Sequence, residues 1–495
     1  MKESINNKKK LKMFKSFVKQ NTMKIGFDIQ KYIRLQKKAI INEIKKYGKV
    51  YFELGGKLLD DYHASRVLPG FSPDTKMRIL SDLKDYSELV FCINSENIQN
   101  ERIRSDYNTL YVEDCLKLIE SYRNMGFLVS GIVLSLFNGQ EKAIKFSEFL
   151  KSKGENVYFS KYASNYPNDI ESAIGAFKDS DYIQTSRPLV IITSSGSASG
   201  KLSTCLAQIY QEYLRGNKVG YSKYDIFPVW NLPVNHPLNL AFLAATADSK
   251  DEILVDTYYQ KKHNKIVSNY NRDLNAFPLI SKILALANNG ETLYSSPTEM
   301  VVNKMKEAII DDELVCEMSK KEIYRRLLTY YKQYLRGQSD KSPIIRVKNI
   351  MRQNGISMDS LNNVKIARSI FKKNPNEKIG VLQLLNGKIL IAKDSSKYSI
   401  GSKLIWDYLS LIGIKLDFIN DNNCKIDIWN MIDLIKSNKL NLNLFNNLIN
   451  SDLHTSYVIP ISEEMGMKQF GINVTCELKT DKLIMEKQDE TGIIK

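Results

Sequence analysis

The chain has 495 residues, 43% of them hydrophobic and 25% charged, and carries a formal net charge of +16. This composition excludes collagen-like, fibrous and wholly disordered proteins, and the length predicts about two to four domains. No apolar run is long enough to cross a bilayer, so no membrane partner is expected.

Residues 1–22 form a basic segment that contains seven Lys and one Glu. This segment lacks the apolar stretch of a signal peptide, so secretion is not expected. We predict a disordered basic extension ahead of the patterned chain. Elsewhere the basic residues are dispersed and not interleaved with aromatic side chains, which argues against a nucleic-acid surface.

From residue 25 onward, amphipathic helical patterns alternate with short apolar runs. This alternation predicts a multi-domain α/β protein whose N-terminal domain, residues 23–274, is a three-layer α/β/α (Rossmann-like or P-loop-like) unit with mainly parallel strands. The predicted strands are 50–54, 88–94, 127–136, 157–160 and 188–193. The predicted helices are 33–47, 114–125, 141–153 and 202–214.

The block that follows strand 50–54 gathers charged residues. Asp61, His63 and Arg66 lie close together, and Lys57 precedes them. A carboxylate, an imidazole and a guanidinium can combine acid/base catalysis with anion binding, so these three are candidate catalytic residues and Lys57 a candidate phosphate ligand. The same residues can equally form a local ion-pair network, and the sequence leaves both interpretations open.

The loop between strand 188–193 and helix 202–214 is an imperfect phosphate-binding loop. It supplies glycines, a lysine and a following helix, which together can bind a phosphate group. The candidate phosphate-binding residues are Gly196, Ser199, Gly200 and Lys201. Against the G-x-x-x-x-G-K-[ST] pattern, Ser195 replaces the first Gly and Leu202 replaces the Mg²⁺-binding hydroxyl, which makes Mg²⁺ doubtful. Asp256, after an apolar run, is an alternative metal ligand.

The pattern changes after helix 202–214. Residues 221–240 are rich in Pro and predict a long ordered loop. Within the cluster 269–273, Arg272 is a further candidate phosphate ligand, although an Arg–Asp pair at a helix start is an equal alternative. Helical patterns at 279–287, 299–310 and 320–335 predict a helical subdomain over 275–345. A smaller C-terminal α/β domain is expected over 346–490, where strands 381–385 and 389–392 flank an Asn-Gly turn signal.

The chain has six cysteines, with no C-x-x-C pair and no His close to them in sequence. We therefore predict no metal site. Cys92 and Cys205 lie in apolar patterns typical of small buried side chains in a reducing compartment, so the expected location is the cytoplasm.

Residues 55–71 closely resemble the opening signature of an uncharacterised bacterial family called domain of unknown function 1846. Segments at 185–188, 199–201, 230–233, 269–273 and 473–477 also resemble that family. The resemblance implies a multi-domain α/β protein with a nucleotide-binding-like core, and it implies no reaction. The family's loop is richer in Gly and Pro, and here the Cβ of Ala198 is expected to hinder a left-handed turn or a close ligand approach.

Three functions follow as hypotheses. The first is a nucleotide- or phosphometabolite-dependent enzyme for phosphotransfer or hydrolysis, with ATP or another nucleotide as the cofactor. The second is a non-catalytic ligand-sensing or assembly protein that binds a small phosphorylated ligand at the same loop. The third is RNA binding through the surplus charge. The sequence leaves the substrate and any homo-oligomer undecided.

Overall fold

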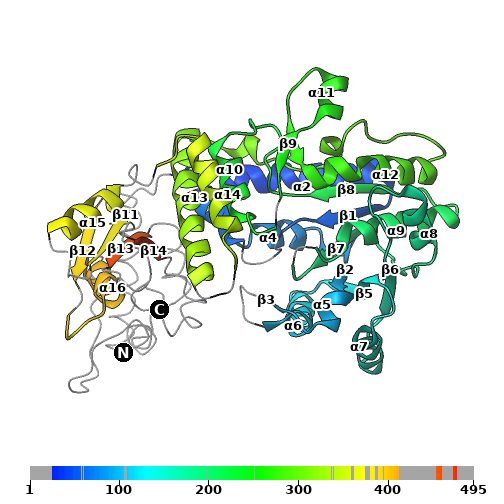
Figure 1. Cartoon of the computed structure of the whole chain (residues 1–495). Helices are drawn as coiled ribbons and strands as arrows, with labels where there is room; N and C mark the ends of the chain where they lie inside the picture. The colour runs from blue at the N-terminus through cyan, green and yellow to red at the C-terminus, as the bar shows by residue number, and fades with distance from the viewer. Residues whose placement is uncertain are drawn as a thin grey trace, which may run out of the picture.

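A six-stranded, all-parallel sheet lies at the centre of the N-terminal part of the molecule (Figure 1). The structure is a computed structural model that describes residues 25–56, 58, 61–104, 109–196, 198–249, 251–335, 337, 339–357, 362–373, 379–384, 388–393, 395–411, 453–459 and 472–476. The strand order is β6-β5-β2-β7-β1-β8. The strands are β1 (Val50–Leu54), β2 (Ser87–Asn94), β5 (Leu128–Phe137), β6 (Val157–Lys161), β7 (Leu189–Ser194) and β8 (Gly220–Tyr224).

Both faces of the sheet are buried, which is why its strands appear in the sequence as continuous apolar runs. In β1, Val50, Phe52 and Leu54 join the core on one face, whereas Tyr51 joins the core on the other. This alternation is the period of two that an extended strand imposes. All five strands predicted from the apolar runs are present, and the parallel α/β arrangement is confirmed.

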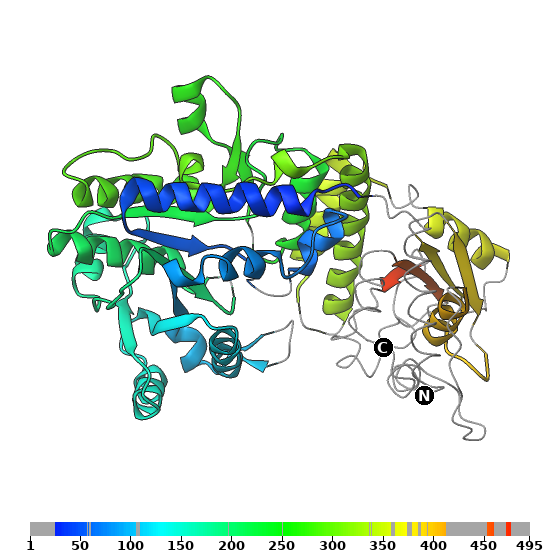
Figure 2. The ribbon, with the colours of Figure 1, turned by 180° about the vertical axis from the view of Figure 1, so that it is seen from behind.

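Helices cover the two faces as separate layers. We call the core that contains Val50, Phe52 and Leu54 the first core, and the core that contains Tyr51 the second core. The first core includes residues of α2 (Ile29–Tyr47), α4 (Thr75–Ser81), α6 (Tyr111–Asn124) and α7 (Glu141–Ser152), and Figure 2 shows α2 lying along that face. Residues of α8 (Ile170–Lys178), α9 (Lys201–Leu214) and α12 (Asn271–Ala287) belong to the second core.

Strand β7 occupies a special place because it lies between β1 and β2. The chain leaves β1 and β2 toward helices of the first face, but it leaves β7 toward α9 on the second face. Neighbouring loops therefore diverge on both sides of β7, at the carboxyl edge of the sheet. In open α/β sheets this divergence forms the crevice where ligands bind.

A helical layer extends the first core beyond the sheet. It contains α3 (Tyr62–Val67), α10 (Pro237–Ala245), α13 (Asp312–Leu335) and α14 (Ser342–Gln353). The two-stranded antiparallel pair β9 (Ile253–Val255) and β10 (Ser268–Tyr270) lies outside the main sheet. The remaining short elements are α5 (Ser95–Gln99), β3 (Ile103–Arg104), β4 (Thr109–Leu110), α11 (Thr257–His263), and the 3₁₀ turns η1 (Lys84–Tyr86), η2 (Pro297–Met300) and η3 (Lys306–Ala308).

The C-terminal part contains a four-stranded antiparallel sheet in the order β12-β11-β13-β14. Its strands are β11 (Ile379–Leu384), β12 (Ile389–Lys393), β13 (Leu453–Ile459) and β14 (Ile472–Cys476), and its helices are α15 (Asn362–Lys373) and α16 (Ile400–Leu411). The predicted pairing of strands 381–385 and 389–392 is confirmed. The Asn-Gly turn and the basic extension 1–22 lie outside the described residues.

Two predictions from the sequence were wrong in part. The region 221–240 is not only a loop, because it begins within β8 and ends in α10. Buried Ser222 and Lys223 disguise the apolar pattern of β8. The predicted helix 299–310 is replaced by η2 and η3, and the Gln36 side chain binds the backbone between them through Val302 O and Lys304 N. Within the described residues, no helix is long and apolar enough to cross a membrane.

Candidate anion-binding site

The phosphate-loop candidate lies at the carboxyl end of β7, next to the end of β1. Its lysine folds back over its own loop, because Lys201 Nζ donates to Ser194 Oγ at 3.2 Å, Gly196 O at 3.4 Å and Ser199 Oγ at 3.4 Å. Helix α9 starts at Lys201, and no side chain caps its first amide groups. These N–H groups and the helix dipole give the loop a positive end.

In the described part of the loop, Ala198 with φ 52° and Gly200 with φ 74° are left-handed. Ala198 therefore adopts the left-handed turn that its Cβ was expected to hinder, and the expected hindrance to a close ligand approach stays a prediction. Neighbouring strands anchor the loop, since Asn94 Nδ2 donates to Ala198 O at 3.1 Å and Ser135 Oγ donates to Ser199 O at 2.6 Å. These bonds stabilise a conformation that costs a non-glycine residue about 1–2 kcal/mol.

The start of α9 offers little to a magnesium ion. Leu202 packs against the second core, and the Thr204 hydroxyl is buried against the Cys92 thiol, at 3.5 Å. Asp256, the alternative ligand, caps α11 through Tyr259 N at 2.9 Å and accepts from Thr298 Oγ1 at 2.6 Å. Asp256 follows β9, which is not part of the main sheet, so the structure gives it a structural role.

A buried cluster of charged side chains lies around the ends of β1 and β8. Lys223 Nζ lies 2.7 Å from Asp273 Oδ2 and 3.0 Å from Asp225 Oδ2. Burial alone would lower the pKa of Lys223, but the two carboxylates outweigh it and raise that pKa. Glu53 is buried at the end of β1, where Tyr221 donates to its Oε2 at 2.7 Å.

Lys201 and Lys223 are two described lysines of this region, and they differ in whether a carboxylate contacts the ammonium group. Burial lowers the pKa of Lys201, and the charges of Glu53 and Asp225 oppose that shift without cancelling it. Lys201 forms no ion pair with any carboxylate in the described part of the chain, whereas Lys223 forms two. Among the described residues at this edge, Lys201 is therefore a cation without a contacting carboxylate.

Two buried hydroxyl groups near the loop have no hydrogen-bond partner among the described residues, namely those of Ser95 and Tyr166. Ser95 follows the end of β2, beside the loop anchor Asn94. Burial raises the pKa of Tyr166, and the charges of Glu53 and Asp273 add to the shift. Buried polar groups are nearly always paired in native proteins, so these hydroxyls are candidate ligand contacts.

Arg272, a predicted phosphate ligand, lies at the rim of the charged cluster. Its Nε is 3.0 Å from Asp251 Oδ1, and its guanidinium lies over the ring of Tyr270, 5.3 Å from the centroid. Its side chain is 53% exposed. The Arg–carboxylate alternative is thus present, and it involves Asp251 across the β9–β10 region rather than the neighbouring Asp273.

The block at 55–66 separates into two parts. Asp61 caps α3 and lies 3.0 Å from Lys76 Nζ, which also donates to Gly55 O at 2.9 Å. Burial alone would raise the pKa of Asp61, but Lys76 outweighs it and lowers that pKa. Asp61 thus stabilises the turn that follows β1. Lys57 lies outside the described residues.

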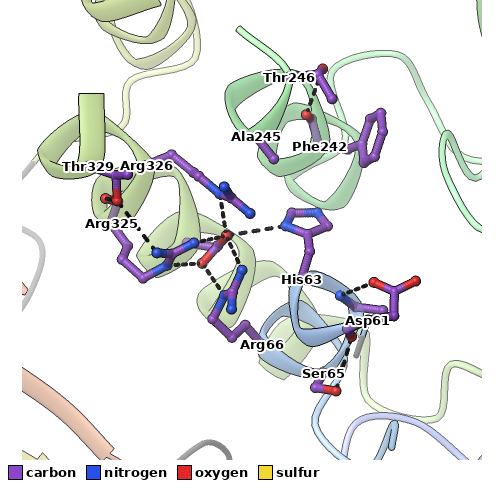
Figure 3. Close-up of polar contacts among 12 residues, drawn as sticks. Asp61, His63, Ser65, Arg66, Phe242, Ala245, Thr246, Arg325, Arg326 and Thr329 are labelled. Atoms are coloured by element: carbon purple, nitrogen blue, oxygen red, sulfur yellow. Dashed lines mark hydrogen bonds and ion pairs between the residues drawn. The ribbon is translucent and has the colours of Figure 1, made fainter. Parts of the chain in front are cut away.

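His63 and Arg66 instead face α13, where a single buried carboxylate, Glu322, binds both (Figure 3). Arg66 Nε donates to Glu322 Oε2 at 2.8 Å, and His63 Nδ1 lies 3.2 Å from Oε1. Arg325 and Arg326 of α13 also donate to this carboxylate. Burial would raise the pKa of Glu322, but the three guanidinium groups outweigh it and hold that pKa well below its usual range.

The surroundings of His63 are unfavourable for a general base. Burial between Phe227 and Phe242 lowers its pKa to about 4, although Glu322 opposes the shift. A base with this pKa removes protons inefficiently near neutral pH. Asp61 and His63 form no hydrogen bond or ion pair with the described residues of the loop. The ion-pair alternative stated for this block is therefore present in the structure.

The sequence did not indicate several residues that the fold brings together. Glu53, Lys223 and Asp225 meet because β1 and β8 are adjacent parallel strands, and no local pattern in the sequence marks the three as neighbours. No His is close to a cysteine in sequence, but the fold places Cys316 Sγ 3.5 Å from His236 Nε2. Burial and the Asp312 carboxylate raise the pKa of Cys316 to about 11, so this thiol is not an activated nucleophile.

Comparisons with known proteins agree on one relationship. A family model described as "Domain of unknown function DUF1846, N-terminal" matches residues 25–355. A UPF0371 protein of Clostridium tetani (strain Massachusetts / E88) is 33% identical, covering 92% of this chain and 98% of that protein. UPF0371 proteins of Clostridium botulinum strains Eklund 17B and Kyoto are 40% and 39% identical, covering 75% of this chain and 76% of each protein. The region matched by the family model includes the six-stranded sheet, the loop and α13.

Proposed function

Because the chain belongs to the DUF1846 family, which is named for a domain of unknown function, its role has to come from its site, and we propose that it binds a small phosphorylated molecule at the β7–α9 loop. The observation that carries this proposal is Lys201. Its ammonium is held by three oxygen atoms of its own loop and by no carboxylate of the described residues. A half-buried cation without a counter-ion favours an anionic ligand.

The backbone supports the same ligand. A phosphate group seated at the start of α9 would accept from the uncapped amides near Gly200 and Lys201, where the helix dipole is positive. The divergence of the chain around β7 opens this edge of the sheet to a ligand. Ser199 and Gly196 then line the phosphate subsite, and Arg272 contributes from the rim.

The carboxylates nearby narrow the class of ligand. Glu53, Asp225 and Asp273 are acceptors, and they would repel a ligand that is anionic throughout. A ligand with a phosphate at one end and hydroxyl or amino donors at the other satisfies both parts of the site. Sugar phosphates and nucleotides meet this description, and the unpaired Tyr166 hydroxyl offers a further contact.

Binding without turnover is the second candidate, and the absence of a hydroxyl at position 202 favours it. Magnesium-dependent phosphotransfer uses a Ser or Thr there as a metal ligand, and this chain has Leu202. We propose that Asp61, His63 and Arg66 have a structural role beside the site, because their partners are Lys76 and Glu322.

Thermal unfolding with added ligands tests the proposal. We expect a hexose phosphate or a nucleoside phosphate to raise the melting temperature, since a ligand at 100 times its Kd stabilises by about 2.7 kcal/mol. The variant Lys201→Gln should lose the shift. The control is Lys218→Gln, which removes the same charge from an exposed residue beyond the other end of α9. No shift with any phosphorylated compound, or a shift that survives in Lys201→Gln, would refute the proposal.

A further inference from the structure

A second cluster of chemically reactive side chains lies away from the sheet edge, where the starts of α10 and α13 meet. It consists of His236, Asp312 and Cys316, whose ligand atoms all lie within 4.8 Å of one another. Asp312 and Cys316 are four residues apart at the start of α13 and so occupy the same face of that helix. His236 caps α10, through a bond from Leu238 N to its Nδ1 at 3.2 Å.

The contacts converge on one nitrogen atom. His236 Nε2 lies 3.2 Å from Asp312 Oδ1 and 3.5 Å from Cys316 Sγ, and Sγ lies 3.9 Å from Asp312 Oδ2. In a Cys–His–Asp nucleophilic triad the carboxylate binds the imidazole nitrogen opposite the thiol. Here the carboxylate and the thiol approach the same nitrogen, so a nucleophilic triad does not describe the cluster.

From this convergence we infer that His236, Asp312 and Cys316 bind a divalent transition-metal ion, with Zn²⁺ as the expected ion. Zinc bonds of about 2.0 Å to nitrogen and oxygen and about 2.3 Å to sulfur place tetrahedral N and O ligands roughly 3.3 Å apart, and N and S ligands roughly 3.5 Å apart. With Oδ2 as the carboxylate ligand, the observed separations are 3.4 Å from His236 Nε2 to Asp312 Oδ2 and 3.5 Å from His236 Nε2 to Cys316 Sγ, which agree with this geometry. The Sγ–Oδ2 separation is longer by a few tenths of an ångström.

The donor types indicate the kind of metal. One imidazole, one thiolate and one carboxylate suit Zn²⁺ and chemically similar ions, and they do not suit Mg²⁺ or Ca²⁺, which prefer oxygen ligands. The His236 side chain is 10% exposed and that of Asp312 is 58% exposed, so the cluster is open on the Asp312 side. Three protein ligands and an open side are typical of a zinc ion whose fourth ligand is water or a substrate.

Metal binding at Nε2 requires the proton of the neutral imidazole to lie on Nδ1. A protonated Nδ1 cannot accept the hydrogen bond from Leu238 N. Metal binding therefore breaks the hydrogen bond that caps α10 and forms a metal bond at Nε2. The ion would link His236, the N-cap of α10, to Asp312 and Cys316, which both belong to α13. We therefore expect the metal to stabilise the contact between α10 and α13.

Cobalt(II) is the probe, because a cobalt–thiolate bond gives a charge-transfer absorption band that a site made only of nitrogen and oxygen ligands lacks. We expect the full chain, freed of metal with a chelator, to develop this band at one equivalent of Co²⁺ and to lose it when Zn²⁺ is added. The variant Cys316→Ser should lack the band. Thermal unfolding of the variant without metal establishes that it is folded.

Two further variants separate the ligands from their structural roles. His236→Asn removes the imidazole but keeps a side chain that caps helices well, and it should weaken Co²⁺ binding by more than roughly tenfold. Asp312→Asn should weaken binding similarly, whereas Glu313→Gln, an exposed neighbour with the same change of charge, should leave it unchanged. Absence of the thiolate band in the unmodified chain, or its persistence in Cys316→Ser, would overturn the inference.

Discussion

Arg66 and Glu322 are 256 residues apart in the chain and form a buried two-pronged ion pair, with Arg66 Nε 2.8 Å from Oε2 and Nη2 3.2 Å from Oε1. The pair joins α3, which follows the first strand of the sheet, to α13 of the helical layer. Arg325, Arg326 and His63 share the same carboxylate (Figure 3). One acidic side chain therefore holds several basic groups at the contact between two distant segments.

The variant Glu322→Gln should be strongly destabilised. It leaves three guanidinium groups without their buried counter-ion, and breaking such a pair typically costs about 3–5 kcal/mol. Urea unfolding would measure the change. Glu313→Gln is the control, because it makes the same chemical change on an exposed part of the same helix and should cost less than about 0.5 kcal/mol. Equal losses in the two variants would show that the cluster contributes nothing.

The protein should lose stability as the pH falls from about 6.5 to about 4, in part because of His63. Burial lowers the pKa of this imidazole from 6.5 to about 4, so the unfolded chain takes up a proton in this range that the folded chain does not. Proton uptake by the unfolded state lowers the free energy of unfolding, here by about 3 kcal/mol over the whole interval.

The same interval includes carboxylate effects, since the pKa values of Asp61 and Glu322 are lowered in the folded state and their contributions are also lost toward acid pH. The difference between the unmodified chain and His63→Gln isolates the imidazole, because the amide has no charge to gain. Urea unfolding at several pH values should give a free-energy difference that changes across this interval. If the free energies of unfolding of the two proteins changed in parallel with pH, the lowered pKa of His63 would be contradicted.

Two glycines at opposite ends of α9 provide a matched pair, because Gly200 and Gly216 both have φ 74°. A Cβ at Gly216 meets nothing within 4 Å, whereas a Cβ at Gly200 lies 2.8 Å from Ser135 Cβ. Gly216→Ala should therefore cost only the left-handed strain, about 1–2 kcal/mol. Gly200→Ala should cost roughly 1–3 kcal/mol more, because the loop is forced away from β5. Similar losses in denaturant unfolding would mean that the loop adapts freely.

Glu53→Gln should strengthen anion binding at the loop. Among the charged groups that raise the pKa of Lys201, the Glu53 carboxylate has the largest effect. The same negative charge must also repel a bound phosphate. Removing that charge while keeping an acceptor for Tyr221 should raise affinity roughly threefold to tenfold. Isothermal titration with the best phosphorylated ligand would measure this. Glu148→Gln, an exposed change on α7, should leave affinity unaltered, and weaker binding in Glu53→Gln would contradict the charge argument.

The sheet was largely predictable because its strands are buried on both faces and so appear as apolar runs. The exception was β8, where Lys223 lies in the interior and is stabilised by Asp225 and Asp273. A buried lysine is recognised only through its partners, and one of those partners lies 50 residues further along the chain. Local pattern therefore failed where tertiary ion pairs compensate for burial.

The candidate sites also differed in whether the local sequence could reveal them. The loop at 195–201 was visible because its glycines, lysine and helix are contiguous. By contrast, His236 and Cys316 are 80 residues apart in the chain. Arg66 pairs with Glu322 of α13, and the sequence around Arg66 does not indicate this distant partner. Spacing rules for metal ligands detect sites within one motif, and this cluster is formed by the packing of two helices.

The place of β7 between β1 and β2 has a consequence for synthesis on the ribosome. Strands β1 and β2 are translated before β7, which lies between them in the sheet. The edges of β1 and β2 that pair with β7 therefore stay unpaired until residues 189–194 have been translated and have entered between them. A nascent chain that stops short of this point exposes two unpaired apolar strand edges, which are sites of aggregation. Shortened forms of the protein should therefore retain β7 and the strand that follows it.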